Sequence, residues 1–153
     1  MKSLKLKFFF VLLGLMAIVS CKKDDPKLSE LILGVWVADE FFFNSQEFTS
    51  VVDYEIEFKG DMTYKVEFLI DPPDPNSPNT QLIYTGDWSI DEANSVLTLE
   101  YDHRDDVWYG VVGWWVSNDI KEERYDMKLV NDKIGLDGII GGNIVVINLE
   151  PKN

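Results

Sequence analysis

The feature that most constrains this chain is the spacing of its apolar residues from Leu31 onward, which recur at every second position. Tyr54, Ile56 and Phe58 alternate with acidic residues, and after a short turn the same alternation resumes at Tyr64. Period-two runs that are separated by Gly, Asn, Asp and Pro are typical of β-strands with one buried and one solvated face. The pattern therefore predicts an all-β chain.

The number of these runs predicts how the strands are arranged. Short turns join eight or nine runs, which cover residues 35–43, 53–58, 63–68, 82–90, 97–101, 107–116, 125–129, 134–136 and 143–149. A chain of sequential hairpins predicts an antiparallel up-and-down β-barrel of about eight strands, because closure removes the exposed edges of an open sheet. A β-sandwich is the alternative. Only residues 118–124 could form a turn of helix.

The first 20 residues have the three parts of a secretory signal peptide. A basic start is followed by an apolar run from Phe8 to Val19 and by a small residue, Ser20. The apolar run spans about 18 Å as a helix, which is too short for the ~30 Å hydrocarbon core of a bilayer. We therefore expect residues 1–20 to be a signal peptide, residues 21–30 a tether and residues 31–153 one barrel domain.

The end of this leader, residues 18–21, resembles the lipobox of bacterial lipoproteins. The resemblance implies that Cys21 is lipidated, with palmitate-type acyl chains, and becomes the mature N-terminus. Cys21 is the only cysteine in the chain, so it has no disulfide partner that would explain it otherwise. The next four residues, Lys22 to Asp25, resemble the export signal of Bacteroidetes surface lipoproteins. This second resemblance implies an outer-membrane, lipid-anchored protein at the cell surface, although a simple polar tether explains the same four residues.

The net charge argues against nucleic acid as a partner. The whole chain carries 14 basic and 27 acidic residues, and three of the lysines lie in the leader. A strongly acidic surface without a basic patch repels a phosphate backbone. We therefore expect no nucleic-acid partner.

Two tryptophan-containing segments carry a further resemblance. Gly34-Val35-Trp36 resembles the Gly-x-Trp signature of lipocalins, in which the tryptophan closes one end of the barrel. Together with residues 86–90 and 97–99, it makes residues 28–150 similar to the lipocalin-like, calycin-type domains of Bacteroidetes lipoproteins. A Thr-Asp-Tyr motif and a late arginine after Arg124 are absent. The resemblance implies a barrel that holds a small hydrophobic molecule, with Trp36 buried across one end.

The sequence gives little support for an enzyme or a cofactor. His103 is the only histidine and lies in a charged segment, which disfavours a histidine-based metal site or a catalytic triad. The oxygen-bearing residues of the proline-rich segment 71–79 do not have the spacing of an EF-hand. Alternation also places Glu55, Glu57 and Glu67 on the outer face. We expect neither catalysis nor a metal nor a cofactor.

The strict alternation fails in one run, Val107 to Val116. If this run is one barrel strand, Tyr109 and Trp115 lie on one face and Trp108 and Trp114 on the other, so both faces are apolar. A large exposed apolar surface marks a ligand, partner or membrane contact. The alternative is that a neighbouring loop covers the run or that it packs at a barrel end.

These observations lead to one prediction and two alternatives. The chain is predicted to be a lipid-anchored, outer-membrane or cell-surface binding module that holds a small apolar or amphipathic ligand or docks a partner protein. Its contact residues are predicted to be Trp108, Tyr109, Trp114 and Trp115. The first alternative is a structural or accessory lipoprotein whose barrel is filled by its own side chains. The second is a module that binds a surface glycan on the tryptophan faces.

Overall fold

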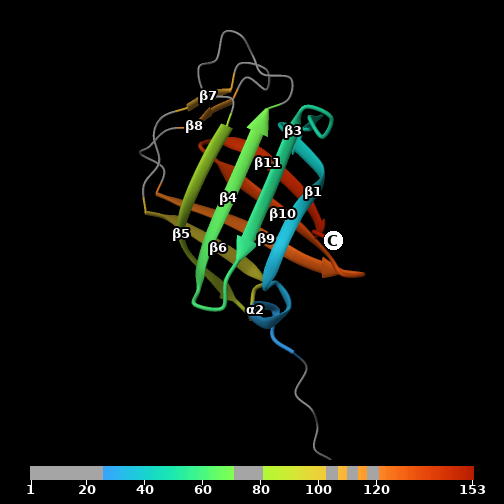
Figure 1. The fold of residues 1–153 in the computed structure, drawn as a ribbon, viewed down its shortest axis with the longest axis vertical. Coiled ribbons are helices and arrows are strands. Elements are labelled where there is room, and N and C mark those ends of the chain that lie inside the picture. Colours follow the sequence, from blue (N-terminus) through green and yellow to red (C-terminus); the bar gives the residue numbers. More distant parts are fainter. Residues whose placement is uncertain (1–25, 71–80, 103–106, 110–113, 117–120) are drawn as a thin grey trace, which may run out of the picture.

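The computed structural model describes residues 26–70, 81–102, 107–109, 114–116 and 121–153, and in these ranges most of the chain is β-strand (Figure 1). A four-residue helix, α2 (Leu28–Leu31), precedes the first strand. The strands are β1 (Gly34–Phe43), β2 (Gln46–Glu47), β3 (Val52–Phe58), β4 (Thr63–Ile70), β5 (Gln81–Asp91), β6 (Val96–Tyr101), β7 (Val107–Tyr109), β8 (Trp114–Val116), β9 (Glu122–Val130), β10 (Lys133–Ile140) and β11 (Asn143–Pro151).

Eight of the described strands form a closed barrel. Their order is β1, β3, β4, β5, β6, β9, β10 and β11, all neighbours are antiparallel, and β11 pairs with β1. The short strand β2 adds to β1 outside this ring, and β7 and β8 pair with each other in a separate two-stranded sheet. The predicted up-and-down barrel is therefore confirmed, and the sandwich alternative is excluded because the sheet closes on itself.

The alternation in the sequence produces the barrel because every second residue of each strand points inward. Along β3 the inward residues from Val52 to Phe58 are buried, whereas the acidic residues between them are exposed or half-buried on the outer face. The outer-face prediction for Glu55, Glu57 and Glu67 is thus confirmed. The interior of an eight-stranded barrel is just wide enough to be filled by side chains. Apolar and tyrosine side chains from all eight barrel strands form one buried core.

Strand β1 departs from this simple parity. Trp36 and the half-buried Ala38 occupy the inward positions of its first half, whereas Phe41 and Phe43 occupy those of the second. The pairing of β1 with β11 shifts register between Ala38 and Glu40. A β-bulge inserts one extra residue and so moves the inward positions from even to odd numbers. The bulge lets the strand curve around the barrel while both halves stay buried.

The barrel has two unlike ends. We call the end formed by α2 and by the turns at residues 59–62 and 92–95 the basal end, and the opposite end, beside β7 and β8, the hairpin end (Figure 1). Strands β1, β4, β6 and β10 run from the basal end to the hairpin end, and the other four barrel strands run back.

Two departures from the predicted elements have simple causes. Residues 122–124, part of the stretch considered for a turn of helix, begin strand β9, because they continue the alternation that leads into Tyr125. Strand β10 extends to Ile140, well past the predicted 134–136 segment. There Gly138 occupies an inward position next to Tyr125, where a Cβ would lie only 2.7 Å from the tyrosine ring, and this glycine interrupts the apolar pattern.

Candidate functional site

The four aromatic residues predicted to form the contact lie in the β7–β8 hairpin. The expectation of one strand across 107–116 is wrong, because Val107–Tyr109 and Trp114–Val116 are two short strands paired with each other. In this register Trp108 is opposite Trp115, and Tyr109 is opposite Trp114. The hairpin is outside the barrel ladder and follows the last residues of β6 at the hairpin end.

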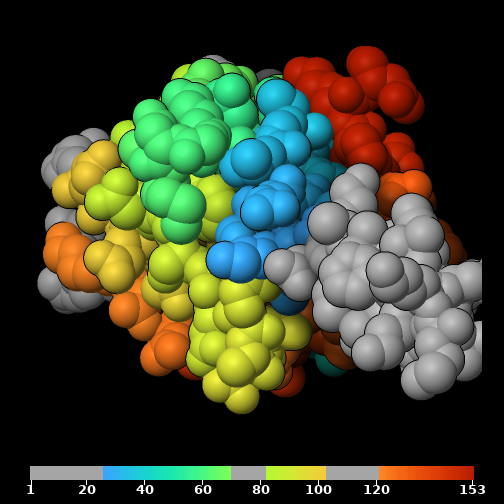
Figure 2. Space-filling view, turned by 90° about the horizontal axis from the view of Figure 1, so that it is seen from below, coloured from blue at the N-terminus to red at the C-terminus, as the bar shows by residue number. Residues whose placement is uncertain are grey.

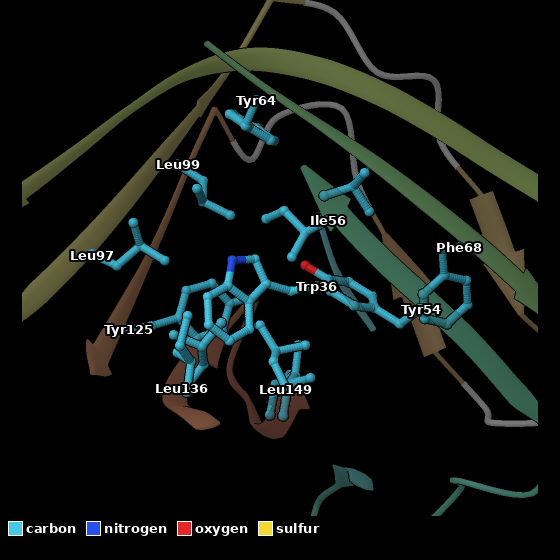
Figure 3. Packing of buried hydrophobic residues seen from close by; sticks show 14 of the residues in the cluster. Trp36, Tyr54, Ile56, Tyr64, Phe68, Leu97, Leu99, Tyr125, Leu136 and Leu149 are labelled. Atoms are coloured by element: carbon cyan, nitrogen blue, oxygen red, sulfur yellow. The ribbon is translucent and has the colours of Figure 1, made fainter. Parts of the chain in front are cut away.

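The basal end is sealed by tryptophans that hydrogen-bond to the backbone. Trp36 is 6% exposed, and its indole N–H donates to the carbonyl oxygen of Ile32 at 2.7 Å. Trp88 is 3% exposed, and its indole N–H donates to the carbonyl oxygen of Lys59 at 3.2 Å. Figure 3 shows Trp36 in the interior with Leu136 and Leu149. The predicted burial of Trp36 across one barrel end is confirmed.

A side chain from the opposite wall ties helix α2 to this end. The Glu92 carboxylate, in the β5–β6 turn, accepts hydrogen bonds from the backbone N–H groups of Leu28 and Ser29 at 2.9 and 3.0 Å and from the Ser29 hydroxyl at 2.6 Å. These bonds satisfy donors that a helix leaves open at its N-terminus. They also lower the pKa of Glu92.

The interior is more polar in the half of the barrel toward the hairpin end. Glu123, the second residue of strand β9, is 2% exposed and is the only buried charged residue among those the structure describes. The Tyr125 hydroxyl donates to Glu123 Oε2 at 2.8 Å. Burial raises the pKa of Tyr54, Tyr84 and Tyr125 well above 10.0, and the negative charge of Glu123 adds to the rise in each. A carboxylate and three tyrosines therefore share one interior region.

Three tyrosine rings pack around a glycine in the same interior. Gly86 on β5 is paired with Tyr64 on β4 and with Tyr101 on β6. The rings of Tyr64, Tyr84 and Tyr101 meet edge to face, with centroids 5.1 to 6.4 Å apart. A Cβ on Gly86 would lie 1.8 Å from the carbonyl oxygen of Glu100, so this position accepts only glycine. We call Glu123 with Tyr54, Tyr64, Tyr84, Tyr101 and Tyr125 the tyrosine–glutamate cluster.

This cluster was not predicted from the sequence. The stretch before Tyr125 was considered for a helix, which hid the inward position of Glu123. Extending the alternation of Tyr125 and Met127 backwards by two residues places Glu123 on the inner face, so the signal was present. An acidic residue at an inward position of a strand is the signal that identifies such a site.

Three described hollows lie on the outer face of the barrel. The largest, about 550 Å³, lies over β6, β9, β10 and β11 and is lined in part by Arg124, Asp137, Ile139 and Ile144. Two others lie beside the β1 bulge. One, of about 300 Å³, lies over β3 and β4, and the other, of about 290 Å³, lies over β9 and β10. All three are open to solvent and are lined by both charged and apolar side chains, and the largest has a mainly apolar lining that includes the exposed Ile139 and Ile144.

Several predicted features lie outside the described residues. They are Cys21, the segment from Lys22 to Asp25, the proline-rich segment 71–79 and His103. Within the described ranges, no three His, Cys, Asp or Glu side chains come together as metal ligands. Within the same ranges, no helix has the length and apolarity needed to cross a bilayer.

Comparison with known proteins does not assign the chain to a family. Neither the protein-family models, nor the curated protein sequences, nor the solved structures gave a significant match.

Proposed function

We propose that this chain is a lipid-anchored binding module of the outer membrane, attached through Cys21, that takes up its ligand or partner at the hairpin end of the barrel. The observation that carries the proposal is the contrast between the two ends. One end is sealed by Trp36, Trp88 and α2, whereas a separate hairpin with four aromatic residues stands beside the other. Large aromatic residues outside a closed barrel are suited to a contact.

The interior chemistry near the hairpin end supports an amphipathic ligand. The β7–β8 hairpin carries four aromatic residues, and the tyrosine–glutamate cluster contributes hydroxyl and carboxylate groups in the adjoining half of the barrel. Ligand sites in proteins combine mostly apolar walls with a few placed polar groups. A small molecule with one apolar and one hydroxyl- or amine-bearing end fits this combination.

A probe titration tests the binding proposal. The neutral apolar dye N-phenyl-1-naphthylamine should bind saturably, with its fluorescence rising on binding, and Trp108→Ala or Trp115→Ala should weaken its binding severalfold. Val130→Ala is the control, because Val130 is 62% exposed on β9, away from the hairpin. Absence of saturable binding would favour the filled, structural barrel instead. Binding of a soluble glycan but not of the dye would favour the carbohydrate module.

Two variants test the anchor and the leaflet. Cys21→Ala removes the thiol that acyl chains require, so the variant should leave the membrane fraction. Replacing residues 22–25 by alanine should keep the lipid but protect the domain from protease added to intact cells. The surface assignment fails if the protease reaches both proteins equally.

A further inference from the structure

We propose that the basal end of the barrel is a bilayer-contact surface and that Leu31, Leu33 and Met62 insert into the interfacial region of the lipid. We call these three residues the basal apolar surface. The inference rests on the proposed attachment at Cys21. It adds a defined face of the barrel that contacts the membrane, and hence an orientation in which the hairpin end points away from the lipid.

The basal apolar surface gathers exposed side chains from two segments. Leu31, Leu33 and Met62 are 41%, 44% and 42% exposed, although each is a large apolar residue. Gly34 pairs with Phe58, so the chain just before β1 runs beside the turn that begins at Lys59. Figure 2 looks at this end from below and shows the α2 segment, in blue, beside the green segment around residue 60.

Met62 is unusual for the backbone position that it occupies. Its φ is 68°, in the left-handed region that favours glycine and small polar residues. The other non-glycine residues described with positive φ are all small and polar, namely Asn44, Ser45, Ser95, Asn131 and Asp132. Met62 lies outside the buried core and is 42% exposed, so packing in the core does not explain a large apolar residue at this left-handed position. Contact with an apolar or interfacial surface would bury the exposed part of this side chain and so explain a methionine at this position.

The tether brings this end, and not the other, to the membrane. The described chain enters at the basal end through Pro26 and α2 (Figure 1). Five residue steps separate Pro26 from Cys21, and they span at most about 18 Å when fully extended. The ten residues of β1 cover about 25 Å along the axis of a tilted barrel. The lipid surface is therefore within reach of the basal end, and the hairpin end is farther from it.

The charges at this end point to an apolar contact rather than an electrostatic one. Lys27 and Lys59 are exposed there, but acidic residues balance them. The Asp61 carboxylate accepts from the Thr63 N–H and hydroxyl, and the Glu92 carboxylate accepts from α2. With both signs present, neutral phosphatidylcholine should serve as well as an anionic lipid. Apolar side chains buried at the interface then supply the attraction.

Methionine methyl signals report on the contact directly. A chain that begins at Cys21 contains the complete core and two methionines, the exposed Met62 and the buried Met127. Its single thiol can be coupled to a maleimide lipid in a phosphatidylcholine nanodisc that carries nitroxide lipids. We expect the Met62 methyl signal to lose intensity severalfold. A methyl group at Ser45→Met should keep most of its intensity, because Ser45 has a φ of 67° in a turn at the hairpin end.

Two charge substitutions sharpen this test. Leu33→Lys should restore much of the Met62 signal, whereas Ile139→Lys, at a residue 73% exposed near the hairpin end, should not. The proposal is overturned if the Met62 and Ser45→Met methyl groups broaden equally, or if neither broadens. It is also overturned if added salt abolishes the contact, or if the free chain sediments as a dimer that Met62→Lys dissociates. Because the lipid is coupled chemically, these outcomes do not depend on whether cells acylate Cys21, which the fractionation of Cys21→Ala decides separately.

Discussion

The two ends of the barrel bury polar aromatic groups with different hydrogen-bond partners. At the basal end each buried indole N–H donates to a carbonyl of the chain that crosses the end, so Trp36 and Trp88 are held by the backbone. Toward the hairpin end the Tyr125 hydroxyl donates to another side chain, Glu123. The basal end is therefore held by side chain to backbone hydrogen bonds, and the other half contains a side chain to side chain hydrogen bond between two buried residues.

If the proposed function is correct, this difference separates the end that stabilises the barrel from the end that binds. The basal end has the features of a structural closure, with a capped helix, two tryptophans and the turn at residues 59–62. The other half holds polar groups whose burial is costly unless they are hydrogen-bonded. Substitutions at the basal end should therefore mainly lower the free energy of unfolding, whereas substitutions at the hairpin should mainly weaken binding.

The largest effect is expected at the sealed end. Trp36→Ala removes a side chain that is 6% exposed together with its hydrogen bond to Ile32, and should lower the free energy of unfolding by about 3 to 5 kcal/mol. Urea unfolding followed by circular dichroism measures this. Ile139→Ala, at an exposed position, is the control and should change stability by no more than about 0.5 kcal/mol. A loss below about 1 kcal/mol for Trp36→Ala would show that the tryptophan does not close the barrel.

The next largest loss of stability is expected where β5 and β6 approach closely at Gly86, between the tyrosine rings. Gly86→Ala places a Cβ 1.8 Å from the Glu100 carbonyl, so β5 and β6 must separate, at a cost of about 1 to 3 kcal/mol or more. Gly60→Ala is the matched control, because nothing lies within 4 Å of its Cβ. Thermal unfolding of the two variants should give a clearly lower midpoint for Gly86→Ala. Equal midpoints would mean that the two strands can move apart freely.

Some features of the two ends can be predicted from the sequence and others cannot, depending on whether the residue pattern differs between the inner and outer faces of a strand. Period-two alternation identified the barrel strands, and the position of Trp36 at the start of the first strand indicated its burial. The β1 bulge has no sequence signal, because the even and odd halves of β1 both contain apolar residues. The inward positions of Glu123 and Gly138 are not obvious from the sequence, since a charge and a glycine inside a strand look like a loop or a helix when pairing partners are unknown. The 107–116 run predicts one strand instead of two because adjacent apolar residues do not show where a strand reverses.

An effect that is absent at neutral pH and appears only in alkali is expected from the buried tyrosines. The pKa values of Tyr54, Tyr84 and Tyr125 are raised in the folded protein, so above pH 10 the unfolded chain loses protons that the folded chain retains. The stabilisation is complete below pH 10 and decreases as the pH rises, by up to about 1.4 kcal/mol per tyrosine for each pH unit. Tyrosinate absorbance and circular dichroism, recorded together in an alkaline titration, should change in one step. Ionisation of all six tyrosines before any unfolding would contradict the burial.

The smallest effect on stability is expected at the hairpin, where the effect on binding should be largest. Strands β7 and β8 pair only with each other among the described strands, so removing a side chain there leaves the barrel ladder intact. At least one variant in the set Trp108→Ala, Trp114→Ala, Tyr109→Ala and Trp115→Ala should keep the free energy of unfolding within about 0.5 kcal/mol of the parent. The same variant should weaken dye binding severalfold, as measured by fluorescence titration. If all four lose the several kcal/mol that are typical of core aromatics, about 3 to 5 kcal/mol each, the hairpin is packed against the barrel and its role as the contact is disproved.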